Sequence, residues 1–205
     1  MTAADAALAE RLRRALDEDV RHEAGYVSAD TGDLAGMFPN GFTPAAVLVP
    51  IVARPKPGVL LTLRNAAMRQ HAGQIAFPGG RADPDDDGPV ATALREAEEE
   101  IGLPRAAVTV IGAADRYHTI TGYQVTPVVG LIAPDTALMP HPGEVADIFE
   151  VPLDFLLQPD NHRTRAVDWE GRQRHYFEIV WNDRCIWGAT AAMIVNLSRR
   201  LAIAA

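Results

Sequence analysis

The chain has 205 residues, of which 48% are apolar and 22% charged, a balance typical of a soluble globular protein with one core. Its formal net charge of −8 argues against binding along a nucleic acid, which requires a basic face. No apolar run approaches the ~18 residues of a membrane span, and Asp5 and Glu10 interrupt the apolar core that a secretion signal would need, so neither nucleic acid nor membrane is expected as a partner.

A single cysteine, Cys185, excludes an intramolecular disulfide and fits a reducing compartment. We therefore expect a cytoplasmic protein. The cysteine itself is predicted to be a small buried apolar residue rather than a catalytic thiol.

The first predicted element is an amphipathic helix over residues 3–19, where leucines recur at helical spacing. Turn-forming residues follow to about Pro44, and short β-branched runs begin at Ala45. The pattern predicts a helical N-terminal extension, residues 1–44, and one domain, residues 45–205. The extension either covers the functional site or forms a homodimer contact, and the sequence does not choose between these roles.

Strand and helix patterns are mixed along the predicted domain. The strand candidates are residues 45–53, 58–63, 108–114, 123–132 and 174–181. A short helix is predicted after Pro152, and a closing helix over residues 189–205.

The best-defined element is a helix over residues 89–101. A proline suits its first turn, and Gly102 followed by a leucine is the expected left-handed stop. At about 100° per residue, its apolar side chains form one stripe, whereas Glu96, Glu99 and Glu100 fall on a separate face.

Three carboxylates on one helix face repel one another, so they predict a bound cation. Mg²⁺ favours oxygen ligands and retains waters and substrate phosphates. The Pro-Gly-Gly turn upstream lets a ligand approach the backbone, and a carbonyl of Gly79 or Gly80 would join the metal ligands. Arg95 can pair with a neighbouring carboxylate and hold it in place. The alternative is an acidic helix face exposed to solvent.

Residues 95–103, Arg-Glu-Ala-Glu-Glu-Glu-Ile-Gly-Leu, together with Gly80 and the acidic loop between them, resemble the signature box of the Nudix hydrolases. The resemblance implies an α/β fold, an α/β/α sandwich around a mixed β-sheet. It also implies hydrolysis of diphosphates linked to another moiety, with Mg²⁺ or Mn²⁺. The interval after Gly80 is one residue longer than usual, so the roles of Asp83, Asp86 and Asp87 stay open.

Residues 60–80 are similar to the motif of the coenzyme A pyrophosphatase branch of this family. The matching residues include Arg64, Arg69, Gly73, Phe77 and Gly80. Asn65 stands where that branch usually has Ser or Ala. Guanidinium groups suit both the 3′-phosphate and the diphosphate of coenzyme A. For each arginine, support of the fold through a buried ion pair is the alternative.

Glu144, in the segment "HPGEVADIFEVPL", resembles the position at which the family presents another glutamate to the site, as a metal ligand or a general base. The resemblance therefore implies a site with three groups of residues. The catalytic residues are Glu99, Glu144 and Arg95; the metal ligands are Glu96, Glu99, Glu100 and Gly79; the substrate-binding residues are Arg64, Arg69, Gly73, Phe77 and Gly80.

The implied activity is hydrolysis of coenzyme A or acyl-coenzyme A to 4′-phosphopantetheine, or its acyl form, and adenosine 3′,5′-bisphosphate. Two alternatives stay open. One is a Nudix hydrolase of another nucleoside diphosphate derivative, such as ADP-ribose or NADH. The other is a nucleotide-binding module of the same fold without turnover.

Overall fold

The computed structural model describes residues 3–17, 37–68, 71–169 and 172–204. The strands in this part of the chain are β1 (Thr43–Val52), β2 (Gly58–Arg64), β3 (Ile75–Ala76), β4 (Gly79–Arg81), β5 (Thr109–Ala113), β6 (Tyr117–His118), β7 (Tyr123–Ile132), β8 (Val145–Pro152), β9 (Arg163–Trp169), β10 (Arg172–Trp181) and β11 (Arg184–Trp187). The α-helices are α1 (Ala3–Ala15), α4 (Gly88–Ile101), α5 (Leu153–Leu157) and α6 (Gly188–Ile203).

The first eight strands form one mixed sheet, in the order β3-β2-β1-β7-β5, with β4 added to β1, β6 to β7 and β8 to β2. At its centre β1 and β7 pair in parallel without a break, from Thr43 opposite Tyr123 to Val52 opposite Ile132. All other pairs are antiparallel. Both central strands are almost continuously apolar, as expected for strands that are covered on both faces.

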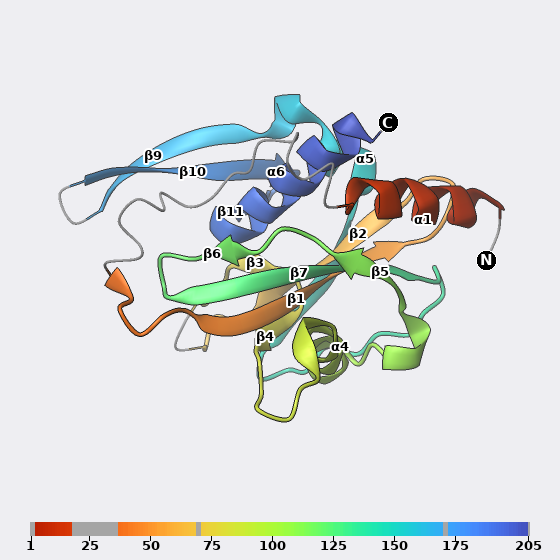
Figure 1. The fold of residues 1–205 in the computed structure, drawn as a ribbon, viewed down its shortest axis with the longest axis horizontal. Coiled ribbons are helices and arrows are strands. Elements are labelled where there is room, and N and C mark those ends of the chain that lie inside the picture. Colours follow the sequence, from red (N-terminus) through yellow and green to blue (C-terminus); the bar gives the residue numbers. More distant parts are fainter. Residues whose placement is uncertain (1–2, 18–36, 69–70, 170–171, 205) are drawn as a thin grey trace.

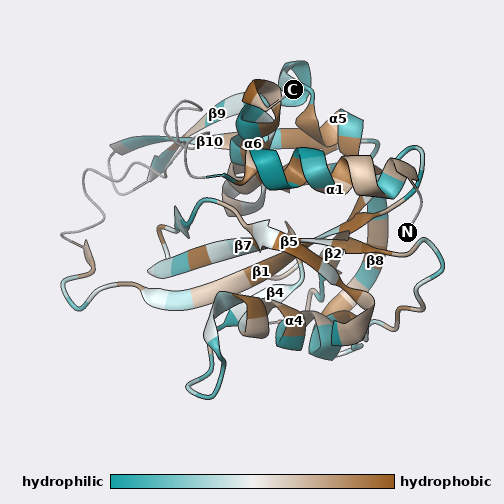
Figure 2. Ribbon diagram, turned by 45° about the vertical axis from the view of Figure 1, so that its right-hand side comes forward, coloured by the Kyte–Doolittle hydropathy of each residue, from teal (hydrophilic) through white to brown (hydrophobic). Residues whose placement is uncertain are grey.

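Helix α4 covers one face of the large sheet, and α1, α5 and α6 cover the other (Figure 1). Alternation along β1 produces these two layers, because successive side chains of a strand point to opposite faces. Ala46 and Leu48 pack beneath α4, whereas Val49 and Ile51 join the core beneath the other three helices. The hydropathy colouring shows the apolar strands between the helices (Figure 2). The predicted α/β/α sandwich around a mixed sheet is confirmed.

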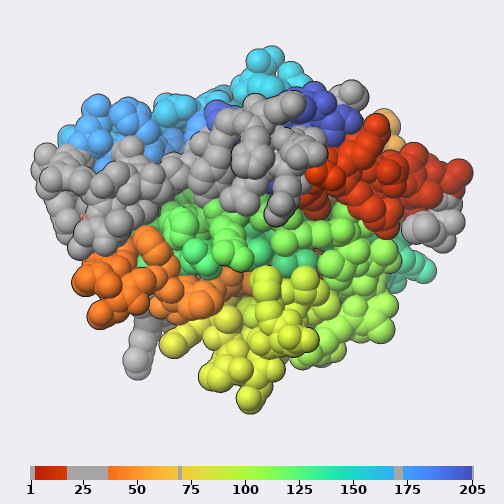
Figure 3. Space-filling view, in the orientation of Figure 1, coloured from red at the N-terminus to blue at the C-terminus, as the bar shows by residue number. Residues whose placement is uncertain are grey.

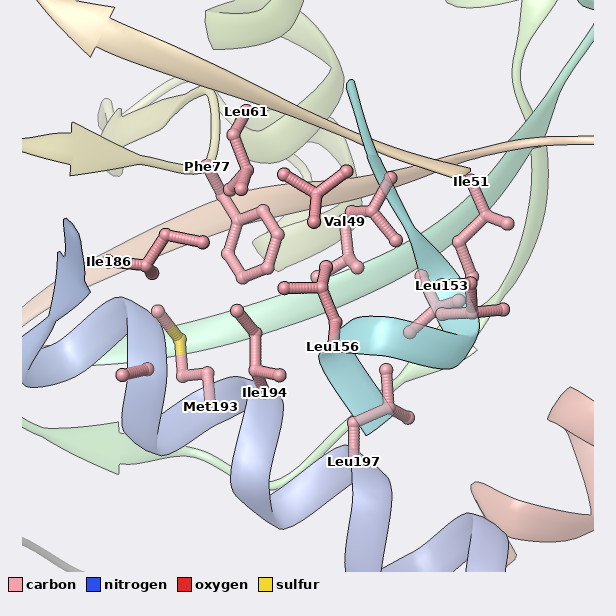
Figure 4. Close-up of a cluster of buried hydrophobic side chains, with 14 of the residues drawn as sticks. Val49, Ile51, Leu61, Phe77, Leu153, Leu156, Ile186, Met193, Ile194 and Leu197 are labelled. Atoms are coloured by element: carbon pink, nitrogen blue, oxygen red, sulfur yellow. The ribbon is translucent and has the colours of Figure 1, made fainter. Parts of the chain in front are cut away.

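The larger core lies between the sheet and helices α5 and α6 (Figure 4). Phe77 projects into it toward Ile186 and Met193, and Leu156 of α5 packs beside Ile194 of α6. A second sheet, in the antiparallel order β11-β10-β9, lies beyond α6 and contributes Ile186 to the same core. No helix in the described part of the chain is both long and apolar enough to cross a membrane.

The predicted helices and longer strands are confirmed, including the central helix, whose stop residue Gly102 has φ 63°. The N-terminal helix ends at Ala15, and the last residues of the predicted 3–19 lie outside the described part. Six strands were not predicted. Four of them, β3, β4, β6 and β11, have two to four residues and carry no readable period. In β8 the acids Asp147 and Glu150 stand three residues apart, which hides the alternation of a strand, and β9 is exposed from Arg163 to Asp168.

The prediction that Cys185 is buried is wrong. Its side chain is exposed on β11, where the neighbouring Ile186 points into the core instead. Side chains alternate along a strand, so only one of two adjacent apolar residues can face the core. Composition alone does not show which one this is.

Helix α1 packs on α6 through the buried side chains of Ala9 and Leu12. In the space-filling view it lies against the body of the molecule beside the C-terminal helix (Figure 3). Arg200 of α6 fixes this arrangement. Its guanidinium makes two hydrogen bonds of 2.7 and 2.8 Å to Asp115, and it also donates to the backbone oxygen of Ala15 at 3.0 Å. The two alternative roles of residues 1–44, covering the functional site or forming a homodimer contact, both stay predictions.

Replacing Arg200 with leucine should lower the free energy of unfolding by about 3 to 5 kcal/mol, because the carboxylate of Asp115 would stay buried without its partner. Urea unfolding followed by circular dichroism measures the loss. Arg199→Leu is the matched control, because the adjacent side chain is exposed and a small change is expected there. Equal losses in the two variants would contradict a structural role specific to Arg200.

Candidate active site

Packing of α4 on the sheet determines how its three glutamates are exposed. Ala93, Ala97 and Ile101 are fully buried against the sheet, which turns the side chain of Glu100 inward and that of Glu99 outward. The exposed fractions of the side chains are 3% for Glu100, 16% for Glu96 and 59% for Glu99. Exposure to water therefore increases across the acidic face, from the buried carboxylate of Glu100 to the exposed carboxylate of Glu99.

Glu100 is the buried carboxylate of the site. Arg64, at the end of β2, donates from Nη1 to Oε1 of Glu100 at 3.2 Å, and the backbone N–H of Gly79 donates to Oε2 at 3.1 Å. Burial nevertheless raises the pKa of Glu100 to about 7, because neither donor fully replaces the lost water. Burial also raises the pKa of Glu96.

The Pro-Gly-Gly turn and β4 bring the backbone against these glutamates. A Cβ at Gly79 would collide with the backbone oxygen of Ala46, and one at Gly80 would lie 2.6 Å from the carboxylate of Glu96. Only glycine fits at position 79, where the obstacle is backbone, whereas a side chain at position 80 would displace the carboxylate of Glu96. The two glycines thus let β4 lie flat between β1 and α4, with Glu96 and Glu100 directly beneath it.

Arg95 connects most of the remaining acids. Its Nε and Nη2 donate to the two carboxylate oxygens of Asp86 at 3.0 and 2.9 Å. Its Nη1 donates to Glu96 at 2.9 Å and to Glu99 at 3.1 Å. The guanidinium beside Asp86 holds the pKa of that carboxyl well below its usual range. Arg95 therefore fixes Glu96 and Glu99 to the acidic loop.

The structure resolves the question of register that the acidic loop raised. Asp86 is the acid of this loop that accepts hydrogen bonds from Arg95, and it also accepts them from Thr92 and from the backbone of Asp83. The exposed carboxylate of Asp83 lies farther away, 3.7 Å from Nε of Arg95. Asp87 caps the start of α4 without a side-chain hydrogen bond. From the sequence, either Asp86 or Asp87 could be the acid of the signature box, because the loop is one residue longer than usual. The path of the folded loop shows that the side chain of Asp86 turns inward.

The loop that carries Glu144 is fastened to the end of α4. The backbone N–H groups of Met139 and His141 donate to the carbonyl oxygens of Ile101 and Glu100, at 2.9 and 2.8 Å. These are among the carbonyls that the helix itself leaves without partners. The side chain of Glu144 is 47% exposed, and its charge contributes to the raised pKa values of Glu96 and Glu100.

Two of the predicted substrate-binding residues, Gly73 and Phe77, do not join this group, and the position of a third is not described. Arg69 lies outside the described residues. Gly73 sits in a turn with φ 69°, where its N–H donates to the backbone oxygen of Arg64. The ring of Phe77 is 2% exposed and packs in the core. Contact of any of the three with substrate stays a prediction.

In the part of the chain that the structure describes, no three Asp, Glu, His or Cys side chains are already arranged to hold a metal ion. Glu96 and Glu99 are bonded to Arg95, and Glu100 is bonded to Arg64. The chemistry of the donors still fits a divalent cation. Glu96 and Glu100 are carboxylates whose ionised forms are disfavoured by burial and by neighbouring carboxylates, and a hard cation would relieve both costs.

Comparison with known proteins gives a consistent result. Residues 42–171 match the family model described as NUDIX domain. Uncharacterized Nudix hydrolase NudL of Photorhabdus laumondii is 46% identical over 78% of this chain and 85% of its own length. The NudL protein of Yersinia pestis is 42% identical over 78% of this chain and 80% of its own length. The crystal structure of the M. smegmatis Nudix hydrolase RenU shares 28% identity, covering 56% of this chain and 73% of its own, with a TM-score of 0.47.

Asp86→Asn should loosen Arg95 and, with it, Glu96 and Glu99. We expect a loss of about 2 kcal/mol in unfolding free energy, typical of a buried hydrogen bond to a charged group, and a 10- to 100-fold lower turnover, roughly as for partners of metal ligands. Urea unfolding and steady-state kinetics measure the two effects. Asp87→Asn is the control and should change neither, so similar losses in both variants would refute the assignment of Asp86.

Glu100→Gln should change how stability depends on pH. The pKa of Glu100 is raised from 4.5 to about 7 in the fold, so the unfolded chain releases this proton first. The stabilising contribution of the protonated group is present below pH 4.5 and is lost as pH rises through 7, by about 3 kcal/mol. Glutamine does not titrate and avoids this loss.

Urea unfolding of both proteins in EDTA, at pH 4 and at pH 8, measures the effect of Glu100→Gln. The difference in unfolding free energy should move in favour of the variant by about 3 kcal/mol between the two pH values. The low pKa of Asp86 is common to both proteins and cancels in the difference. A difference that does not depend on pH would contradict the raised pKa of Glu100.

Proposed function

The chain belongs to the Nudix hydrolase family, and we propose that it cleaves the diphosphate of coenzyme A or an acyl-coenzyme A with the help of Mg²⁺ or Mn²⁺. The observation that carries this proposal is the contact between Arg64 and Glu100. It joins the segment similar to the coenzyme A pyrophosphatase motif, residues 60–80, to the acidic helix. One residue of the segment that suggests the substrate, Arg64, thus lies beside the carboxylates that suggest the chemistry, and this supports the proposal.

Glu96, Glu99, Glu100 and the carbonyl of Gly79 would hold the metal. A bound divalent cation supplies neutralisation of the diphosphate oxygens and orientation of the nucleophilic water and the leaving group. The protein's own contribution is to hold the carboxylates together against their repulsion. Arg64 and Arg95 do this from two sides, Arg64 through Glu100 and Arg95 through Glu96 and Glu99.

Proton acceptance from water falls to Glu99 or Glu144, the exposed carboxylates of the group. The contacts favour Glu144. One oxygen of Glu99 already accepts a hydrogen bond from Arg95 at 3.1 Å, so it is less available to a water molecule. The carboxylate of Glu144 lies 3.9 Å from Nδ1 of His141, which is beyond hydrogen-bond distance.

In the reaction that follows, the oxygen of water forms a bond to one phosphorus and the bridging P–O bond breaks. The proton of water passes to the base, and the leaving phosphate departs with the bridging oxygen. Coenzyme A would yield 4′-phosphopantetheine and adenosine 3′,5′-bisphosphate. Arg64, 19% exposed and held beside Glu100, is placed to bind a substrate phosphate without leaving the site.

We expect the purified protein, with Mg²⁺ or Mn²⁺, to release adenosine 3′,5′-bisphosphate from coenzyme A faster than it cleaves ADP-ribose or NADH. Product analysis by chromatography, with the three substrates in parallel, measures the preference. Faster cleavage of ADP-ribose or NADH would keep the hydrolase assignment and refute coenzyme A as the substrate. Binding without cleavage of any of the three would favour the module without turnover.

The Glu99→Gln variant tests whether the cleavage measured with the three substrates comes from this protein or from a contaminating hydrolase. Turnover should fall by at least 100-fold, roughly the scale of lost acid–base or metal-ligand function, while substrate binding persists. Glu98→Gln is the matched control on the same helix, because the side chain of Glu98 is exposed and pairs with Arg105 away from the other glutamates. Unchanged turnover in Glu99→Gln would point to another hydrolase in the preparation.

A further inference from the structure

Asn65 follows β2 directly and is bonded to the loop that carries Glu144. We infer that Asn65 is a positioning residue, which holds residues 142–144 so that the carboxylate of Glu144 faces the acidic helix. The inference rests on the proposed function for its catalytic consequence. The hydrogen bonds between Asn65 and the loop are observed in the structure and do not depend on the proposed function.

The side-chain amide of Asn65 uses both of its ends. Its Nδ2 donates to the carbonyl oxygen of Pro142 at 2.8 Å, and its Oδ1 accepts from the N–H of Ala67 at 2.9 Å. A carbonyl can only accept and an N–H can only donate, so the two partners fix the orientation of the amide. The side chain thus spans from its own turn to the neighbouring loop.

The backbone of Asn65 grips the same loop a second time. Its N–H donates to the carbonyl oxygen of Glu144 at 2.8 Å, and its carbonyl oxygen accepts from Met68 at 3.1 Å. Pro142 and Glu144 are therefore both held by one residue, with only Gly143 between them. Because the side chain of Glu144 is half exposed, the position of its backbone sets the region in which its carboxylate lies.

Arg64, the residue before Asn65, holds Glu100, another carboxylate of the site. Arg64 pairs with Val145 across the irregularity in the β2–β8 register, and its side chain bonds Glu100. Consecutive residues of one strand end thus hold Glu100 and Glu144. A displacement of the loop at Asn65 would move Glu144 relative to Glu100, and displacements of this kind lower turnover without contact between the mutated residue and substrate.

Asn65→Asp removes one contact and keeps the others. Aspartate can still accept from Ala67, but it places an oxygen against the carbonyl oxygen of Pro142, where the hydrogen bond becomes repulsion. Asn161→Asp is the matched control. The Nδ2 of Asn161 also donates to a backbone carbonyl, that of Phe155 at 2.9 Å, in a part of the fold that carries none of the proposed site residues.

Hydrogen exchange of the metal-free proteins tests whether Asn65 stabilises the loop of residues 142–144. In Asn65→Asp the amides of residues 141, 144 and 145 should exchange at least tenfold faster than in the wild type, roughly the effect of losing one such bond. In Asn161→Asp they should be unchanged. Equal protection in all three proteins would overturn the inference, whatever the kinetics.

Steady-state kinetics with coenzyme A test the consequence for catalysis. Asn65→Asp should lower kcat by about 10- to 100-fold and change KM by less than about twofold, because Asn65 acts through Glu144 rather than on substrate. Asn161→Asp should change neither. A raised KM with normal kcat would show that Asn65 contacts substrate, and unchanged kinetics would leave it a purely structural residue; either result overturns the inference.

A double-mutant cycle with Glu144→Gln identifies the residue through which Asn65 acts. If it acts through Glu144, adding Asn65→Asp to Glu144→Gln should lower kcat little further, whereas independent effects would multiply and refute the inference. Normal turnover in Glu144→Gln would refute it as well. Wild-type protein that cleaves no diphosphate would contradict the proposed function, and hydrogen exchange would then decide alone whether Asn65 holds the loop.

Discussion

Burial of the Glu100 carboxylate beside other carboxylates is the constraint on which the rest of the site depends. Removing an ionised acid from water is costly unless hydrogen bonds and opposite charges replace the water. Arg64 and the N–H of Gly79 supply part of that replacement. The remaining cost appears as the raised pKa of Glu100. A bound divalent cation would remove this cost. The buried carboxylate that is unfavourable in the metal-free protein would then be a metal ligand in the enzyme.

The surrounding elements are built to maintain this arrangement. Two glycines let β4 lie against α4, and Asp86 turns Arg95 so that one guanidinium holds Glu96 and Glu99 together. Backbone groups of the Glu144 loop occupy carbonyls at the end of α4, and Asn65 fastens the loop to β2. Glu100 and the Glu144 loop are thus positioned by groups at the end of β2, whereas Glu96 and Glu99 are held by an arginine of their own helix that the acidic loop orients.

Much of this could be predicted from the sequence, because the signals are local. Pro89 and Gly102 bound α4, and the spacing of its apolar residues places three glutamates on one face. The features that could not be predicted from the sequence depend on contacts between segments that are distant along the chain. Neither the choice of Asp86 over Asp87 nor the partner of Asn65 follows from spacing, since each requires the path of a loop. The short strands and the outward side of Cys185 are likewise settled by pairing rather than by composition.

Crystals of the protein containing Mn²⁺ and an uncleavable diphosphate analogue would test the central claim most directly, through the anomalous scattering of manganese. An anomalous peak in contact with the carboxylates of Glu96 and Glu100, with the analogue's diphosphate bound to the same ion, is the predicted result. It would also require Arg95 to release at least one of its glutamates. Manganese bound elsewhere, or an analogue bound away from these carboxylates, would contradict the account.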